Sequence, residues 1–368
     1  MPAETSSPDT AFKNWFNEAR YRALADQLQA LSKGFDRRQF LHLTLEGLEQ
    51  RALMDRLRQT AIAYQAALPG SYREKLITLR KLAPQIGHAF LAISLGDFVA
   101  REGLDDPAHS LDALKFFTRF GSSEFAVRPF LQRDLSGTLA VMEVWAKDEN
   151  EHVRRLASEG SRPRLPWGLR LRALVEDPQP TGVILDTLKN DPALYVRKSV
   201  ANHLNDIAKD HPDAVIERVR SWDRSLPSTA WIVRHGVRTL VKKGDARALA
   251  LIGASSQVSI DVTDFSVSPR RVRLGEKVLL RAEIVSTRRS SQSLVVDYVV
   301  HYVKSSGGTS AKVFKWTQVD LAPGARICLK KSQQIRDFTT RKHYPGAHRI
   351  ELQINGRRLN SAEFLLRR

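Results

Sequence analysis

Residues 191–206, DPALYVRKSVANHLND, contain the word Val196-Arg197-Lys198, on which the interpretation of the first two thirds of the chain depends. A valine followed by two basic residues also occurs at Val153-Arg154-Arg155 and Val233-Arg234-His235, so the three words stand 43 and 37 residues apart. Spacings near 40 residues are typical of stacked pairs of helices. In each word we expect the valine to face the core and the basic pair to lie at the edge of a concave surface.

The rest of residues 1–255 fits the same pattern. Leucines recur at three- and four-residue steps, as at Leu24, Leu28 and Leu31, which indicates amphipathic helices. Helix breaks are expected at Pro69-Gly70, Asp106-Pro107, Gly121-Ser122-Ser123, Asp177-Pro178, Asp191-Pro192, His211-Pro212 and Pro227-Ser228. Three short words can recur by chance, but their coincidence with these breaks favours genuine repeats. Residues 1–255 are therefore predicted to form an α-solenoid of HEAT-like helical repeats.

Residues 256–368 have a different texture. Val278, Leu280, Ala282 and Ile284 alternate with polar residues, as buried strand positions do. The dipeptide Asn355-Gly356 between two alternating runs is the strongest local signal for a hairpin. Seven or eight short strands in this space fit an immunoglobulin-like β-sandwich. The fold class is thus multidomain, helical repeats followed by a β-sandwich, and residues 253–256 are the expected linker.

Composition excludes several classes of protein. The single cysteine, Cys328, excludes a disulfide framework and a cysteine-rich zinc site. The chain has no apolar run of eighteen residues and no basic-then-apolar start, so we expect no membrane association and no signal peptide. Phosphate-binding loops, dinucleotide fingerprints, zinc-protease motifs and catalytic triads are absent from the sequence. A monomeric cytoplasmic protein, associated with the nucleoid and using no metal or other cofactor, is the prediction.

Net charge is the first specific clue to a partner. The chain carries a formal charge of +18, and residues 1–150 contribute none of it, with 19 basic and 19 acidic side chains. Residues 151–257 carry an excess of +6 and residues 258–368 an excess of +12. Because the excess is confined to part of the chain, it predicts a surface that binds a polyanion. The alternative is a cationic surface without a partner.

Residues 150–168, NEHVRRLASEGSRPRLPWG, combine carboxylates, arginines and an aromatic ring. We expect a helix from about Glu151 to Gly160, with Arg155 and Glu159 on one face. A proline-stiffened loop ending at Trp167 follows. The ordinary interpretation is a helix C-cap with a surface ion pair. An exposed tryptophan beside four arginines is harder to explain in that way.

This segment resembles the hallmark of the HEAT-like-repeat DNA alkylation-repair glycosylases, in particular their AlkC branch. Residues 191–206 and the word Trp231-Ile232-Val233-Arg234-His235-Gly236 resemble the next two repeats of that family. The likeness covers roughly residues 10–255, and some members carry a C-terminal immunoglobulin-like domain. The resemblance implies excision of N3-alkylated bases, such as 3-methyladenine and 3-methylcytosine, from double-stranded DNA.

Such a base is cationic and leaves readily, and cleavage builds positive charge on the sugar. Carboxylates can stabilise that charge and orient water, and aromatic faces add attraction. On this basis we expect Glu124, Glu159 and Asp206 to form the acidic set, with Trp167 as an aromatic wall. Glu124 can alternatively be a capping charge for a helix that starts at Ser122-Ser123.

The basic residues near these motifs are expected to contact DNA phosphates. They are Arg154, Arg155, Arg162, Arg164, Arg197, Lys198, Arg234, His235 and Arg238. In the β domain, Arg341 and Lys342 lie in a predicted loop and are expected to bind DNA as well. The alternative for this domain is a solvated spacer. A non-catalytic HEAT-repeat scaffold for nucleic acid is the rival function, and a protein–protein adaptor is a weaker one.

Overall fold

The computed structural model describes residues 12–338 and 342–367. The chain forms two compact units. The first contains Met1–Asp210 and Leu226–Ile232, and the second contains His211–Ser225 and Val233–Arg368. Among the described residues, no helix combines the length and apolar character that crossing a bilayer requires.

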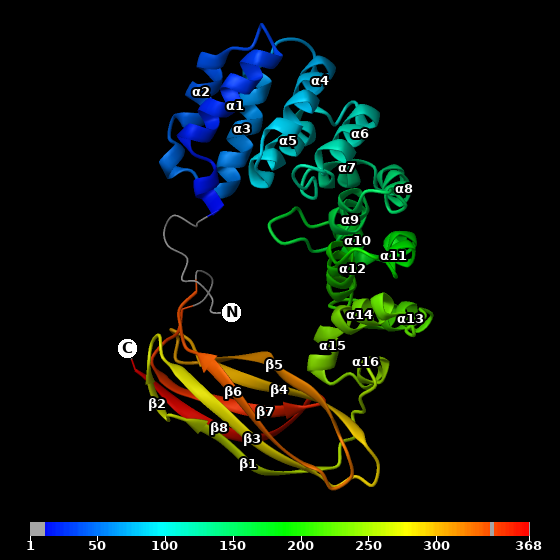
Figure 1. Cartoon of the computed structure of the whole chain (residues 1–368), viewed down its shortest axis with the longest axis vertical. Coiled ribbons are helices and arrows are strands. Elements are labelled where there is room, and N and C mark those ends of the chain that lie inside the picture. Colours follow the sequence, from blue (N-terminus) through cyan, green and yellow to red (C-terminus); the bar gives the residue numbers. More distant parts are fainter. Residues whose placement is uncertain (1–11, 339–341, 368) are drawn as a thin grey trace. The chain divides into compact units, whose positions relative to one another are not determined.

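Helices occupy the chain up to residue 251 (Figure 1). Their bounds are α1 Glu18–Leu31, α2 Arg37–Leu45, α3 Leu53–Ala67, α4 Tyr72–Leu82, α5 Ala89–Glu102, α6 Pro107–Phe117, α7 Arg128–Arg133, α8 Leu135–Trp145, α9 Glu151–Gly160, α10 Arg172–Glu176, α11 Gly182–Leu188, α12 Leu194–Ile207, α13 Pro212–Arg220, α14 Pro227–Gly236, α15 Arg238–Lys243 and α16 Ala246–Leu251. Short 3₁₀ turns cover Phe12–Trp15, Leu48–Gln50, Ala83–Gln85 and Gln179–Thr181.

Local sequence explains where these helices begin. Asn17 caps α1 and Asp134 caps α8 by accepting a backbone N–H with the side chain. Ser71 and Glu74 form a capping box at α4. Proline occupies the first turn of α6, where its missing N–H costs nothing. Every predicted helix break lies between two of these elements or in the first turn of a helix, so the predicted breaks are confirmed.

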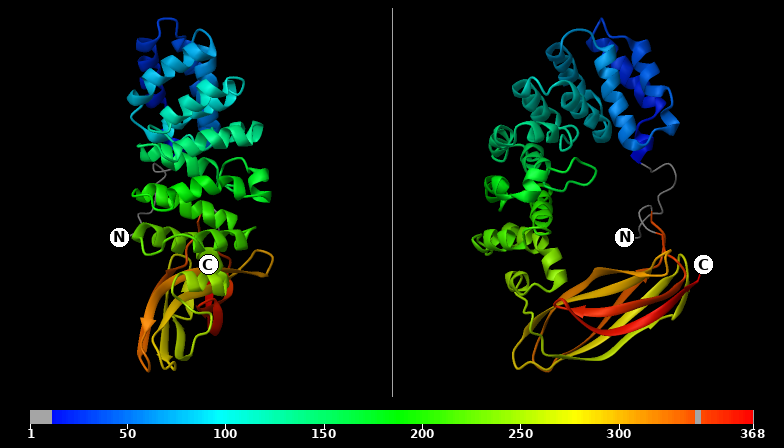
Figure 2. Two further views of the ribbon diagram at one scale, coloured as in Figure 1. Left: turned by 90° about the vertical axis from the view of Figure 1, so that its right-hand side faces the viewer. Right: turned by 180° about the vertical axis from the view of Figure 1, so that it is seen from behind.

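The helices of the first unit stack in chain order, from blue to green in Figure 2. α3 packs against α5, and α9 packs against α12. The valines of the basic words are buried, with 0% of Val153, 0% of Val196 and 1% of Val233 exposed. The valine of each word therefore faces the core, and the HEAT-like α-solenoid prediction is confirmed.

The strands form two sheets, as an immunoglobulin-like sandwich requires. One has the order β1-β3-β6 and the other the order β2-β8-β7-β4-β5. Their bounds are β1 Ile260–Ser268, β2 Arg271–Arg273, β3 Lys277–Ser286, β4 Gln292–Val303, β5 Thr309–Leu321, β6 Arg326–Gln334, β7 Gly346–Ile354 and β8 Arg357–Arg367. Val278, Leu280, Ala282 and Ile284 are all buried in the core, which confirms the alternation.

Asn355 and Gly356 connect β7 to β8 as a two-residue hairpin turn. Their φ angles are +47° and +80°, the left-handed backbone that this turn needs and that Asn and Gly adopt most readily. In the second unit the same turn meets the end of α15. A Cβ atom on Gly356 would lie 2.1 Å from the Cα of Gly244, so only glycine fits there. Gln353 also donates a hydrogen bond to the carbonyl of Lys242, at 2.9 Å.

The compact units divide the chain differently from the predicted domains 1–255 and 256–368. Helices α13, α15 and α16 belong to the same unit as the sandwich. The change from helix to strand itself falls between Leu251 and Ile260, at the predicted linker. Whether the two functions divide at residue 255 stays a prediction.

Candidate active site

A cavity of about 400 Å³ opens in the first unit where the two strongest sequence motifs meet. Its walls come from α5, from the segment before α7, from α9, from the loop that follows α9, and from the first turn of α12. The lining residues are Ala89, Phe90, Ile93, Ser122, Glu124, Phe125, Arg155, Glu159, Arg162, Leu165, Pro166, Trp167 and Tyr195. We call residues 161–171 the Trp167 loop.

Helix α9 has the predicted limits and orients the central carboxylate. Asn150 caps its first turn by accepting the N–H of His152, and the helix ends at Gly160. A Cβ atom at Gly160 would lie 2.5 Å from Val127, so this position requires glycine for close packing. Val153 and Leu156 are buried in the core, while Arg155 and Glu159 line the cavity.

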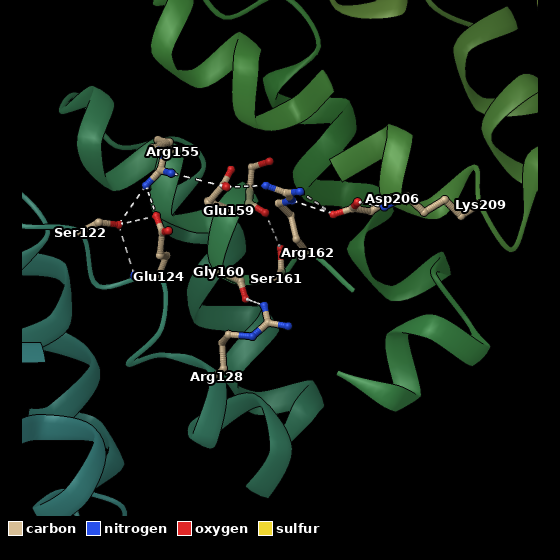
Figure 3. A network of polar contacts seen from close by, with 11 residues as sticks. Ser122, Glu124, Arg128, Arg155, Glu159, Gly160, Ser161, Arg162, Asp206 and Lys209 are labelled. Atoms are coloured by element: carbon tan, nitrogen blue, oxygen red, sulfur yellow. Dashed lines mark hydrogen bonds and ion pairs between the residues drawn. The ribbon is translucent and has the colours of Figure 1, made fainter. Parts of the chain in front are cut away.

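Carboxylates and cations alternate along a continuous network, which we call the ion ladder (Figure 3). Arg155 pairs with Glu124 and lies 3.5 Å from Glu159. Arg162 donates to Glu159 at 2.6 Å and to Asp206 at 2.8 Å. Lys209 closes the ladder by donating to the second oxygen of Asp206, at 2.8 Å. Three carboxylates are thus held by three cations.

Burial makes this ladder different from a surface ion pair. Glu159 is 6% exposed and Asp206 is 2% exposed. Burial opposes the charge of Arg155, but Glu124 and Glu159 outweigh it, so the pKa of Arg155 lies above its usual value. Burial likewise opposes the charge of Arg162, and Glu159 and Asp206 raise its pKa. Both arginines therefore remain cations and keep their carboxylate partners in fixed positions.

Glu124 does not cap a helix. No helix starts at Ser122-Ser123, because the next helix, α7, begins only at Arg128. The hydroxyl of Ser122 donates to the Glu124 carboxylate at 2.8 Å and accepts from Arg155 at 2.9 Å. The capping alternative is therefore wrong, and the carboxylate is directed toward the cavity.

Trp167 lies on the cavity wall and is 68% exposed, as expected for a residue that does not belong to the core. Its φ angle is +65°, a conformation that bulky residues adopt rarely and at a cost. Three further aromatic residues line the cavity, and the sequence predicted none of them: Phe90, Phe125 and Tyr195. The guanidinium of Arg155 lies 4.7 Å from the centre of the Tyr195 ring, a cation–π contact. Burial raises the pKa of Tyr195 and the positive charge of Arg155 opposes this rise; the net shift is upward, so the hydroxyl stays protonated at neutral pH.

The four predicted catalytic residues are not equivalent. Glu124, Glu159 and Trp167 line the cavity. Asp206, near the end of α12, is joined to them through Arg162, which it shares with Glu159. The structure thus brings all four together, with Asp206 one contact further from the cavity.

Most of the predicted phosphate contacts have partners inside the fold. Arg154 pairs with Asp191 at 2.6 Å, and Arg164 pairs with Asp210 through two bonds of 2.8 Å. Arg197 bonds the carbonyl of Pro192 and lies over the ring of Trp231. Together with Arg155 and Arg162, these side chains connect successive repeats. Their contact with phosphate stays a prediction.

The remaining basic candidates lie further along the chain. Lys198, Arg234 and Lys342 are exposed, and His235 and Arg238 are half-buried. Arg238 donates to the carbonyl of His235 at 2.6 Å. Arg341 lies outside the described residues. Within the described ranges, no cluster of three or more histidine, cysteine, aspartate or glutamate side chains could hold a metal ion.

The chain is similar to known proteins. Residues 117–240 match the family model described as DNA alkylation repair enzyme. Residues 261–368 match a model described as the C-terminal Ig-like domain of the uncharacterised protein YhaZ. The chain is 40% identical to "Uncharacterized protein YhaZ" of Bacillus subtilis (strain 168) over 353 residues, which cover 96% of this chain and 98% of that protein.

A solved structure is similar over nearly the whole chain. It is the alkylpurine DNA glycosylase AlkC of Pseudomonas fluorescens bound to DNA containing an abasic site analogue. The two chains share 47% sequence identity with a TM-score of 0.94, and the match covers 97% of this chain and 100% of the other.

Proposed function

Since this chain belongs to the AlkC branch of the DNA alkylation repair enzymes, with their C-terminal immunoglobulin-like domain, we propose that it is a DNA glycosylase for cationic N3-alkylated bases. The proposed reaction is hydrolysis of the bond between deoxyribose and a base such as 3-methyladenine or 3-methylcytosine in double-stranded DNA. The enzyme would be monofunctional, leaving an abasic site without cutting the strand.

One observation carries this proposal: two carboxylates, Glu124 and Glu159, line a cavity together with aromatic side chains that include Trp167 and Tyr195. A cationic base is attracted by carboxylates and by aromatic faces. Cleavage of the glycosidic bond then spreads positive charge over the sugar, and fixed negative groups favour that transition state over the ground state. The arrangement therefore suits a substrate that is positive before and during the reaction.

The ion ladder supplies preorganisation. Because Arg155 and Arg162 hold the carboxylates in place before DNA arrives, little reorganisation is needed when the sugar becomes cationic. In the proposed mechanism Glu124 and Glu159 face the reacting sugar and one of them orients the attacking water. Asp206 acts through Arg162, which it shares with Glu159. No step requires a Schiff base or a metal ion.

The charge distribution supports DNA as the partner. The +12 excess of residues 258–368 and the exposed Lys198, Arg234 and Lys342 would contact phosphates. A monomer in the cytoplasm, associated with the nucleoid, would suffice for this task. The rival is a non-catalytic HEAT-repeat scaffold, which needs the cations but not the buried carboxylates.

The experiment is an incubation of purified protein with a duplex that holds one 3-methylcytosine. Heating in alkali cuts the strand only where a base has been released. We expect alkali-dependent cleavage at the lesion and no cleavage before alkali. Tight binding without base release would favour the scaffold, and cleavage before alkali would contradict the monofunctional assignment.

A further inference from the structure

Arg128, in the first turn of α7, is a cation for which the site described above gives no role. Its side chain is completely buried, whereas arginine is almost never fully buried unless a specific partner holds it. We propose that Arg128 is a positioning residue for base excision, which ties together the two ends of the Trp167 loop and thereby holds Arg162 and Trp167 against the cavity. This inference rests on the proposed function.

Two hydrogen bonds from one guanidinium carry the argument. The Nη1 group donates to the carbonyl of Gly160 at 2.7 Å, and the Nε group donates to the carbonyl of Leu169 at 2.6 Å. Gly160 is the last residue of α9, and its carbonyl has no partner within the helix. Leu169 lies nine residues later, near the other end of the loop. A single planar group on a different helix therefore fixes the distance between the two ends.

The loop between these two points contains backbone that needs such support. Gly168 donates to the carbonyl of Leu165 at 3.2 Å, so the chain turns back immediately after Trp167. Trp167 itself has a φ of +65°, and a side chain in this region persists only when its surroundings determine the conformation. A Cβ atom at Gly168 would lie 3.3 Å from the Cδ of Arg128, so the stem of Arg128 packs directly against the turn.

Charge strengthens the restraint. Burial and the neighbouring charge of Arg162 lower the pKa of Arg128 to about 10, so it remains protonated at neutral pH. Hydrogen bonds from a charged donor are roughly twice as strong as neutral ones. Neutral hydrogen-bonding side chains at this position would hold the loop less firmly.

The Trp167 loop affects catalysis because it carries Arg162. Arg162 lies one residue after the start of the loop and bonds both Glu159 and Asp206. A loop free to shift by about 1 Å would displace Arg162 and its carboxylates, and a misplacement of that size can cost about 10²-fold in rate. Arg128 would thus control the reaction without touching DNA.

The chain offers a matched control for the test. Arg56, on α3, is also buried and also bonds main-chain carbonyls, those of Lys13 at 3.0 Å and Phe16 at 2.8 Å. The side chain of Arg56 donates hydrogen bonds to Lys13, Phe16 and Arg51, and none of these residues lies in the Trp167 loop. Arg128→Met and Arg56→Met both remove a buried guanidinium, so both are expected to lower the melting temperature. Only Arg128→Met is expected to loosen the loop.

Two measurements on the full-length variants, made well below their melting temperatures, decide the matter. Single-turnover excision at saturating enzyme should fall about 10²-fold in Arg128→Met and less than about threefold in Arg56→Met. Hydrogen exchange of residues 161–171 should accelerate in Arg128→Met and remain as in the wild type in Arg56→Met. Arg128→Lys should lie between Arg128→Met and the wild type in both measurements, and it replaces Arg128→Met if that variant does not fold.

Wild-type rate and exchange in the folded Arg128 variants would overturn the inference. Equal rate losses in the Arg128 and Arg56 variants would also overturn it, because general destabilisation would then explain both. If the wild-type protein releases no base while exchange in the loop still responds to Arg128, the proposed function fails and the restraint on the loop stands.

Discussion

Glu159→Gln is the substitution that separates charge from shape in the candidate site. The glutamine side chain would keep an oxygen that accepts from Arg162, now 2.6 Å from Glu159, so the geometry of the ladder should survive. Arg155 would keep Glu124 and Arg162 would keep Asp206, so neither buried cation is left without a carboxylate. The variant is therefore expected to fold, and the change falls on the electrostatics of the cavity.

The magnitude can be worked from the position of the charge. A unit charge about 5 Å from a developing sugar cation contributes roughly 3 kcal/mol at an effective dielectric constant of about 20. Each 1.36 kcal/mol is tenfold in rate, so the loss is on the order of 10²-fold. Removing one preorganised group from an enzyme site has an effect of about this size. Binding to undamaged DNA should hardly change, because Glu159 is buried.

The assay is single-turnover release of 3-methylcytosine from a defined duplex, with affinity for undamaged duplex measured in parallel. Glu176→Gln is the control, since Glu176 is exposed at the end of α10 and does not line the cavity. A wild-type rate in the Glu159 variant would show that the charge of Glu159 does not stabilise the transition state and would remove this residue from the site. An equal loss in both variants would show that the change is not specific to the cavity.

Four further predictions follow from the same structure. Asp206→Asn should lower excision by about 10²-fold with unchanged affinity for undamaged DNA; a wild-type rate would exclude Asp206 from the mechanism. Activity should survive excess chelator, and loss on chelation that one added metal restores would contradict a metal-free reaction. Deleting residues 258–368 should weaken DNA binding and reduce the slope of log K against log salt concentration by about 0.9 for each lost phosphate contact. The double variant Arg341→Ala with Lys342→Ala should show part of this effect. An unchanged slope after the deletion would mean that the domain is only a spacer. Burial raises the pKa of Asp297 to about 6 in the folded protein, above the pKa of the same group in the unfolded chain. The charged carboxylate therefore destabilises the fold at pH 8 by up to about 3 kcal/mol, and this penalty fades as the pH falls through 6. Asp297→Asn should raise the melting temperature at pH 8 and not at pH 4.

Much of the fold could be predicted because its determinants are local. The buried valines, the limits of α9 and the Asn355-Gly356 hairpin follow from spacing and from turn chemistry, which neighbouring residues settle. Glu124, Glu159, Asp206 and Trp167 were placed together only through the resemblance to a family. Spacing alone could not show that residues so far apart in the chain share one ladder.

The roles of the arginines could not be predicted, because they depend on partners from other repeats. Arg154 meets Asp191, and Arg164 meets Asp210, 46 residues later. A count of positive charges does not reveal whether a cation faces solvent or an acidic residue. The role of Arg128 is harder to predict, because its partners are main-chain carbonyls, which every residue has. Tyr195 stood in a recognised motif, and only the structure places its ring beside Arg155.

In the proposed mechanism, fixed carboxylates promote release of a base because that base is positively charged. The most direct test compares two duplexes that differ in one atom, one with 3-methyladenine and one with its neutral 3-deaza analogue. We expect measurable single-turnover release of 3-methyladenine and no detectable release of the analogue, although both bind. Equal release of the two bases, or release of neither, would contradict this mechanism.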